Sequence, residues 1–164
     1  MDKPAAPCSI NAMLDLVLIE PDIPQNLGAV LRLVACIGGA VHVVEPCGFV
    51  LDDKKLKRAG MDYIARAEFH RHADWDAFLR HHAAHPGRLL LLETDGARPY
   101  SDEAFRPGDY LLLGRESHGT PRDYYLAMDE VLTIPMRPGE RSLNVAMAAA
   151  IVLAEAMRQQ GWKL

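Results

Sequence analysis

The segment Tyr110–Pro121, YLLLGRESHGTP, combines residue types and a spacing that suit ligand binding. Its first four residues are bulky and predict a strand buried on both faces. The strand ends at Gly114, where the missing Cβ lets a ligand approach the backbone. Ligands of open α/β sheets bind at the carboxyl ends of strands, so the polar residues Arg115–His118 could face one. An ordinary strand-to-loop junction with solvated charges would produce the same pattern.

Arg32 is a second candidate, because it shares a face of its predicted helix with small residues such as Gly28 and Cys36. A guanidinium in such a place has room beside it for a phosphate, a carboxylate or another chain. Gln25 and Asn26 would lie near the same helix end. An arginine that extends to solvent or pairs with an acid would fit the pattern too.

Two further segments carry candidate binding groups. Lys54, Lys57 and Arg58 share one face of a short helix expected over residues 52–60, and could contact successive phosphates. A solvated surface explains them equally well. Downstream, a proline- and glycine-containing turn leads into Ser142 at a helix start, which offers free backbone N–H groups. Ser142 is also expected to cap that helix, whose many alanines indicate close packing against the sheet or a second subunit.

Metal and hydrolase chemistry are not expected. Five histidines lie between residues 70 and 85, and His81 and His85 share a helical face. No carboxylate or cysteine joins them at ligand spacing. No GxSxG motif accompanies Ser117 and His118.

The composition indicates one globular domain over residues 14–164, preceded by a flexible tail over residues 1–13. The chain has 164 residues and a net charge of −4, so nucleic-acid binding would need a local basic patch. No apolar run approaches the ~18 residues of a membrane span, and the first residues lack the apolar core of a secretory signal. An odd number of cysteines, three, indicates reduced thiols and a cytoplasmic protein.

Alternating strands and helices predict an α/β fold with a largely parallel sheet and flanking helices. The opening reads as a βαβ unit: a strand at Leu14–Glu20, a helix from about Leu27 to Ile37 with Asn26 as its expected N-cap, and a strand at Ala40–Val44. The other expected strands are Glu68–His70, Arg88–Leu92, Tyr110–Leu113 and Val131–Ile134, and the other expected helices are Asp74–His85 and Leu143–Gln160.

Three segments in this order resemble the SPOUT class of RNA methyltransferases, in its SpoU/TrmH branch. They are IPQNLGAVLRL (Ile23–Leu33), LLLGRESHGTP (Leu111–Pro121) and the segment Ile134–Ala156. The similarity spans nearly all of Leu14–Trp162. The short chain looks most like the TrmL subfamily, whose members 2′-O-methylate the wobble nucleotide of certain leucine tRNAs.

The resemblance implies a C-terminal deep trefoil knot, a homodimer, tRNA as substrate and S-adenosylmethionine as cofactor. It implies Arg32 as the catalytic arginine with Asn26 and Asn144 near it, and tRNA contacts at Lys54, Lys57 and Arg58. The cofactor contacts it implies are Leu92, Gly114, Glu116, Gly119, Ile134, Met136, Ser142 and Leu143.

A guanidinium keeps its proton in nearly every protein, so we expect Arg32 to position a phosphate and stabilise the alkoxide. The general base stays open. Three residues depart from the usual pattern: Arg115 replaces a proline, Ala146 a serine and Ala154 a tyrosine. The first predicts a less rigid turn, and all three leave substrate choice and interface details open.

Three other functions remain as alternatives. A Rossmann-type NAD enzyme is disfavoured, because the first strand-to-helix turn lacks GxGxxG. A non-catalytic RNA-binding relative would keep the fold without binding the cofactor. A SpoU-type enzyme could also act on another tRNA or rRNA site.

Overall fold

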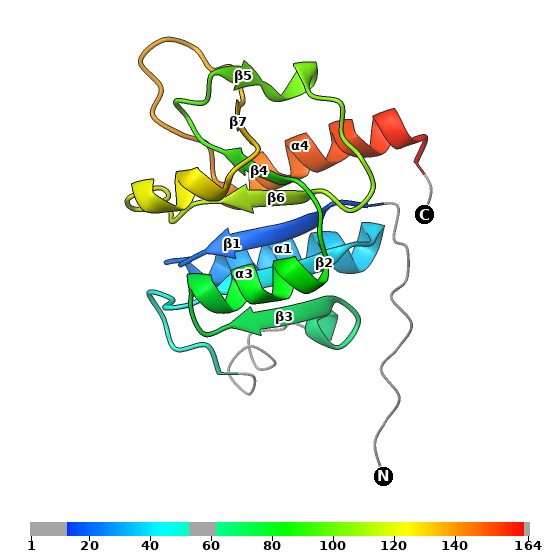
Figure 1. The fold of residues 1–164 in the computed structure, drawn as a ribbon, viewed down its shortest axis with the longest axis vertical. Helices are drawn as coiled ribbons and strands as arrows, with labels where there is room; N and C mark the ends of the chain where they lie inside the picture. The colour runs from blue at the N-terminus through cyan, green and yellow to red at the C-terminus, as the bar shows by residue number, and fades with distance from the viewer. Residues whose placement is uncertain (1–12, 53–61, 163–164) are drawn as a thin grey trace.

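The computed structural model describes residues 13–52 and 62–162. The predicted tail, apart from residue 13, and most of the helix expected over 52–60 lie outside the described residues, as do Lys54, Lys57 and Arg58. In the described part, one parallel sheet has the strand order β3-β2-β1-β6-β4-β7-β5 (Figure 1). Its strands are β1 (Asp15–Ile19), β2 (Ala40–Val44), β3 (Glu68–His72), β4 (Leu89–Leu92), β5 (Arg98–Pro99), β6 (Tyr110–Leu113) and β7 (Glu130–Thr133).

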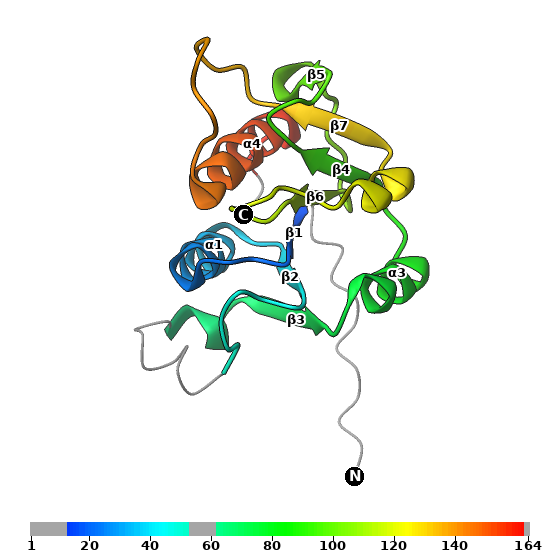
Figure 2. The ribbon, with the colours of Figure 1, turned by 90° about the vertical axis from the view of Figure 1, so that its left-hand side faces the viewer.

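Helices cover both faces of this sheet (Figure 2). The α-helices are α1 (Pro24–Ile37), α3 (Trp75–Ala84) and α4 (Val145–Gln160), and the 3-10 helices are η1 (Asp62–Ala65), η2 (Tyr100–Asp102) and η3 (Arg122–Ala127). Helices α1 and α4 lie side by side on one face, and α3 lies on the other. Burial from both sides explains why β2, β4 and β6 are apolar nearly throughout and fully buried.

The predicted fold class is confirmed, and most element bounds agree within two residues. The first helix is an exception, since it begins at Pro24 rather than near Leu27. Proline suits the first helical turn because its missing N–H would have no intrahelical partner. The prediction of Asn26 as N-cap is therefore wrong: Ile23 occupies the cap position, and Asn26 is buried inside the first turn.

The last helix corrects a second prediction of a cap. Helix α4 begins at Val145, and Asn144 is its N-cap: the Asn144 side-chain oxygen accepts hydrogen bonds from the N–H groups of Ala146 and Met147. Ser142 lies before this cap and does not cap the helix. Among the described residues, no helix is long and apolar enough to span a membrane.

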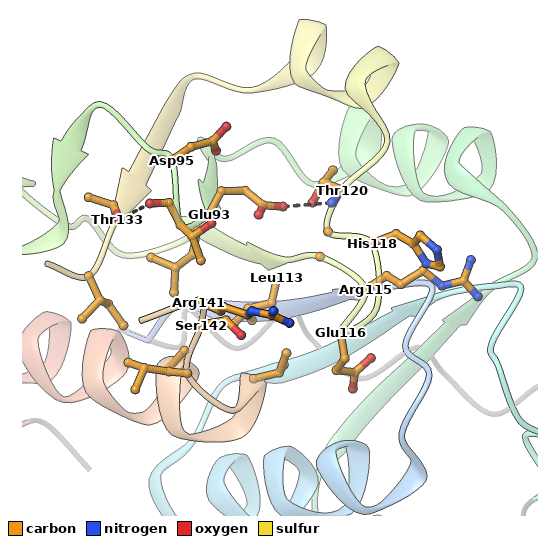
Figure 3. A pocket seen from close by; sticks show the side chains of 18 of the residues that line it. Glu93, Asp95, Leu113, Arg115, Glu116, His118, Thr120, Thr133, Arg141 and Ser142 are labelled. Carbon is orange, nitrogen blue, oxygen red and sulfur yellow. Dashed lines mark hydrogen bonds between the residues drawn. The ribbon is translucent and has the colours of Figure 1, made fainter. Parts of the chain in front are cut away.

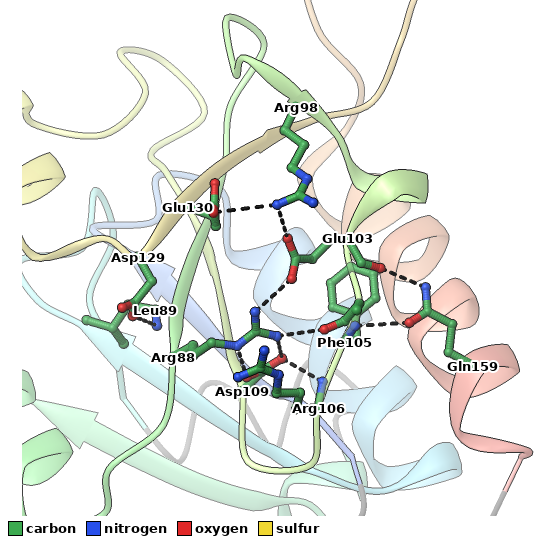
Figure 4. Close-up of polar contacts among 11 residues, drawn as sticks. Arg88, Leu89, Arg98, Glu103, Phe105, Arg106, Asp109, Asp129, Glu130 and Gln159 are labelled. Carbon is green, nitrogen blue, oxygen red and sulfur yellow. Dashed lines mark hydrogen bonds and ion pairs between the residues drawn. The ribbon is translucent and has the colours of Figure 1, made fainter.

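Polar contacts tie the amino ends of the central strands together (Figure 4). Arg88, just before β4, donates to Asp109 at 2.6 and 2.9 Å and to Glu103 at 2.7 Å. Both carboxylates have side chains only 3% exposed, so their charges need this cation. Gln159 of α4 joins the same region, donating to the Glu103 carbonyl and accepting from the Phe105 N–H. The end of α4 is therefore anchored to the loop between β5 and β6.

Candidate functional site

A cavity of about 570 Å³ opens at the opposite edge of the sheet, where β4, β6 and β7 end (Figure 3). The segment between β7 and α4 and the first turn of α1 complete its wall. All the residues predicted to contact a cofactor line this one cavity: Leu92, Gly114, Glu116, Gly119, Ile134, Met136, Ser142 and Leu143. Asn26 and Asn144 line it as well. Segments far apart in the sequence thus converge as the motifs predicted.

The turn after β6 requires glycine. A Cβ at Gly114 would lie 2.7 Å from both a Glu93 carboxylate oxygen and the Thr120 backbone nitrogen, which is closer than a Cβ approaches such atoms in proteins. Gly119 has φ +70°, a conformation that favours glycine. Arg115 and Gly119 close the turn with two backbone hydrogen bonds of 3.3 and 2.8 Å. Glycine is therefore needed at Gly114 because Glu93 and Thr120 pack against it, and the approach of a ligand to this backbone stays a prediction.

A hydrogen-bonded chain joins Glu116, Asn26 and Asn144 across the cavity wall. The Glu116 carboxylate accepts from the Asn26 amide at 2.9 Å and from the Asp22 backbone N–H at 2.7 Å. The Asn144 amide donates to the Asn26 side-chain oxygen at 2.8 Å. Because Asn26 is only 5% exposed, its polar groups need these partners. The three side chains therefore fix the turn after β6 (Gly114–Gly119, the glycine turn) against the starts of α1 and α4.

Asp22, in the loop between β1 and α1, cross-links the turn that follows β6. Its carboxylate accepts from the Arg115 guanidinium at 2.9 Å and from both the hydroxyl and the backbone N–H of Ser117. Hydrogen bonds from Ser117, and next those from Arg115, hold the pKa of Asp22 below its usual value. The Ser117 hydroxyl also lies 2.6 Å from Nδ1 of His118. The arginine that replaces the usual proline is thus tied to the opposite loop by an ion pair.

Arg32 does not line the cavity. It is exposed on α1, and its guanidinium lies 4.8 Å from the ring centre of Tyr63. Its helical face carries small residues, as predicted, and the apolar face with Leu27 and Val30 is buried. Its catalytic role stays a prediction.

Several cavity residues were not identified from the sequence. Glu93 and Thr94 directly follow β4, so the rule that drew attention to Gly114 would also have found them. The Glu93 carboxylate accepts from the Thr120 N–H at 2.9 Å. The remaining ones, such as Asp95, Arg122, Tyr125 and Arg141, lie in irregular segments or a 3-10 helix, where no periodicity marks them.

The histidines form a separate cluster between β2, β3 and α3. His42 Nδ1 lies 2.9 Å from His72 Nε2, and the rings of His42, His70 and His72 stack. Burial, and then the neighbouring imidazoles, lower the pKa of His72 and of His81 to about 4. Over residues 13–52 and 62–162, no three His, Cys, Asp or Glu side chains are arranged to hold a metal ion.

Comparisons with known proteins agree on one family. The family described as "SpoU rRNA Methylase family" matches residues 13–154. A protein of Beijerinckia indica named tRNA (cytidine(34)-2'-O)-methyltransferase is 49% identical over 146 residues, which cover 89% of this chain and 91% of that one.

Solved structures are similar over the same range. One, described as "Structural insights into the 2-OH methylation of C/U34 on tRNA", has a TM-score of 0.83 and 40% identity and covers 93% of this chain and 99% of that one. The SpoU methyltransferase AviRb of Streptomyces viridochromogenes, in complex with the cofactor AdoMet, has a TM-score of 0.79 and 26% identity, covering 91% of this chain and 58% of that one.

Proposed function

This chain belongs to the SpoU rRNA methylase family, and from that premise we propose that it methylates the ribose 2′-hydroxyl of wobble nucleotide 34 in tRNA. The reaction class is RNA 2′-O-methylation with S-adenosylmethionine as the cofactor. The wobble position is supported by relatives of nearly full length that are named for it. Leucine tRNAs are the proposed substrates, with cytidine or uridine at that position. The observation that carries the proposal is the convergence of all eight predicted cofactor residues on one cavity.

The cavity suits the cofactor in size and chemistry. Its volume of about 570 Å³ falls within the usual range of ligand pockets. The Thr120 hydroxyl is buried in its wall and has no hydrogen-bond partner in the part of the chain that the structure describes, so a ligand can complete its bonding. Leu92, Leu113 and Ile134 supply an apolar surface for a nucleoside. When bound, S-adenosylmethionine supplies a methyl group on a positively charged sulfur, which a ribose oxygen can attack in line.

The residues of this chain then bind and orient the reactants. Glu116, Asn26 and Asn144 fix the two helix starts against the glycine turn. Arg32 is proposed to stabilise the oxygen that loses its proton, because a guanidinium stays charged and is a poor base. Lys54, Lys57 and Arg58, which lie outside the described residues, are proposed to bind the phosphates of the tRNA backbone. The proposed location of the reaction is the cytoplasm.

We further propose that the active form is a homodimer. The apolar side chains of Ile23, Leu143 and Met147 are 41, 41 and 60% exposed, and they lie at the neighbouring starts of α1 and α4. Exposed apolar groups gathered in this way are typical of an interaction surface. Because Arg32 lies on the exposed side of α1 and outside its own cavity, we propose that it acts on the cavity of the partner copy.

A C-terminal trefoil knot is also part of this proposal, within a single domain over residues 14–164. Two features support it. The chain runs from β6 out to β7 and then returns, so that α4 packs against α1 and β6. The end of α4 is anchored by Gln159 to the loop that precedes β6.

Localising the transferred methyl group tests the activity. The purified protein is incubated with labelled S-adenosylmethionine and an unmodified leucine tRNA, and the product is mapped by nuclease digestion and mass spectrometry. We expect one methyl group on the ribose of nucleotide 34. A matched tRNA with 2′-deoxyribose at that nucleotide has no acceptor and should stay unlabelled. Label in the deoxy control, or only in rRNA, would contradict the wobble assignment.

A further inference from the structure

The charged side chains of the cavity wall are nearly all engaged with other residues. Glu93 accepts from Thr120, and Glu116 from Asn26 and Asp22. The remaining ion pairs join Arg115 to Asp22 and Arg122 to Asp95, with Arg122 also lying over the ring of Tyr125. Because these charged side chains already have partners, few of their hydrogen-bonding groups are available to bind a charged ligand.

Arg141 is the exception within the described residues. It lies between β7 and α4, three residues before the N-cap Asn144, and its side chain lines the cavity. Figure 3 shows its side chain among those that line the cavity. No hydrogen bond or ion pair joins its guanidinium to another residue in the described part of the chain. Arg141 therefore presents a full set of donors to whatever enters the cavity.

The proposed reaction brings an anion to this place. A ribose within an RNA chain carries a phosphodiester on the carbon next to its 2′-hydroxyl, so delivering that hydroxyl to the cofactor also delivers a phosphate. The cavity wall contains the carboxylates of Glu93, Asp95 and Glu116, which repel a phosphate. A planar guanidinium can bind two phosphate oxygens at once. Within a single copy of the chain, Arg32 lies beside Tyr63 outside this cavity, so Arg141 is the arginine of the same chain that is available there.

We propose that Arg141 binds the phosphodiester adjoining the methylated ribose and so positions the substrate. This assignment rests on the proposed function. The α-carboxylate of the cofactor is the other oxyanion that could reach Arg141, so the test must separate the two. Arg141 is exposed and has no hydrogen-bond or ion-pair partner within the described residues, so its replacement should leave the fold intact.

The experiment compares Arg141→Ala with Arg137→Ala. Arg137 is an exposed arginine of the same segment that does not line the cavity, which makes it a matched control. Binding of a leucine tRNA anticodon stem-loop is measured over a range of salt concentrations. Binding of S-adenosylhomocysteine and of 5′-methylthioadenosine, which lacks the amino-acid part, is measured by calorimetry.

We expect Arg141→Ala to weaken RNA binding about tenfold at low salt. The slope of log affinity against log salt concentration should become shallower by about 1, as the loss of one phosphate contact predicts. Affinity for both nucleosides should stay within about twofold of wild type, and Arg137→Ala should change neither property. Weaker S-adenosylhomocysteine binding with normal methylthioadenosine binding would assign Arg141 to the cofactor carboxylate and overturn the proposal. So would unchanged RNA affinity, or equal losses in both variants.

These outcomes are distinct from failure of the proposed function. If the wild-type protein methylates nucleotide 34 but Arg141→Ala binds RNA normally, only the phosphate assignment falls. If the wild-type protein neither binds nor methylates tRNA, both proposals fall together.

Discussion

At the scale of single residues, Asn26 shows how hydrogen-bond partners determine which residue type a buried position requires. Its amide lies between a carboxylate and a second amide, donating to Glu116 and accepting from Asn144. A carboxylate in its place could not donate, and it would face the Glu116 oxygen that now accepts from Asn26 at 2.9 Å. Asparagine is therefore the residue type that this position requires.

Replacing Asn26 tests that requirement. We expect Asn26→Asp to lose more activity than Asn26→Ala at pH 7 and to regain part of it at lower pH, where one carboxyl can take up a proton. Loss of the buried hydrogen bonds should lower the free energy of unfolding by about 1–3 kcal/mol in either variant. Methyl-transfer rates against pH and chemical denaturation provide the measurements. An activity of Asn26→Asp that rises with pH would contradict this account.

Arg32 leads to a different expectation, because the only described contact of its guanidinium is the Tyr63 ring. We expect Arg32→Ala to abolish methyl transfer and to leave affinity for S-adenosylhomocysteine near the wild-type value. The measurements are a methyl-transfer assay and calorimetric titration of the same preparation. Loss of cofactor binding in this variant would show that the residue has been assigned the wrong role.

At the scale of elements, the sequence predicts periodic segments well and local exceptions poorly. The strands β2 and β6 have the predicted bounds, because a continuous apolar run describes a strand covered on both faces. Strand β5 was missed, since two residues that include a proline at the sheet edge leave no pattern. Two helix caps were assigned to the wrong residue. Helix α1 starts at Pro24, which puts Ile23 at the cap position ahead of the expected Asn26. Asn144 caps α4 in place of Ser142, a residue type with a similar capping preference.

In the candidate site too, the sequence predicted some residues and missed others. Gly114 and Ser142 were found because they belong to motifs, whereas Arg141 required the three-dimensional arrangement of the loop. The replacement of proline by Arg115 predicted a less rigid turn, yet a contact with Asp22 from a distant loop cross-links that turn. The turn propensity of a residue depends on its neighbours in the sequence, so it cannot predict a contact with a distant residue such as Asp22.

The turn after β6 yields a prediction from its packing. Gly114→Ala adds a Cβ where Glu93 and Thr120 already lie within 2.7 Å, so the backbone of the turn must shift. We expect at least a tenfold loss of S-adenosylhomocysteine affinity, because the turn forms part of the cavity wall. Calorimetry measures the affinity, and circular dichroism verifies that the fold is retained. Wild-type affinity would mean that the cofactor does not depend on this turn.

The histidine cluster between β2, β3 and α3 is expected to make the stability of the folded protein fall in acid. The pKa of His72 and of His81 is lowered to about 4 in the folded protein, and that of His42 is lowered too. Histidines that bind protons less readily when folded add stability above their unfolded pKa of about 6.5. That contribution is lost as the pH falls from about 6.5 towards 4. Asp15, 3.8 Å from His42, and Glu68, 3.0 Å from His70, oppose the effect only in part.

We therefore expect the melting temperature to fall between pH 6.5 and pH 4, before most carboxylates are protonated. His81→Gln should make that fall shallower, since it removes one proton-binding group from the cluster. Arg80→Gln, next to it on α3, is a control that should keep the wild-type slope. Equal slopes in all three proteins would show that the cluster does not control acid stability.

At the scale of the whole molecule, one copy of the chain supplies a complete cavity but keeps Arg32 outside it. Two copies related by a twofold axis would each lend the other an arginine. Mixing two inactive variants tests this directly. Arg32→Ala keeps a working cavity and Gly114→Val keeps Arg32, so a mixed dimer contains one site with both parts. After unfolding and refolding together, we expect about a quarter of wild-type activity, because about half of the dimers are mixed and each has one working site of two. Each variant refolded alone should stay inactive. If Arg32 acted within its own chain, no mixed dimer would contain a working site, and the mixture would be as inactive as its components.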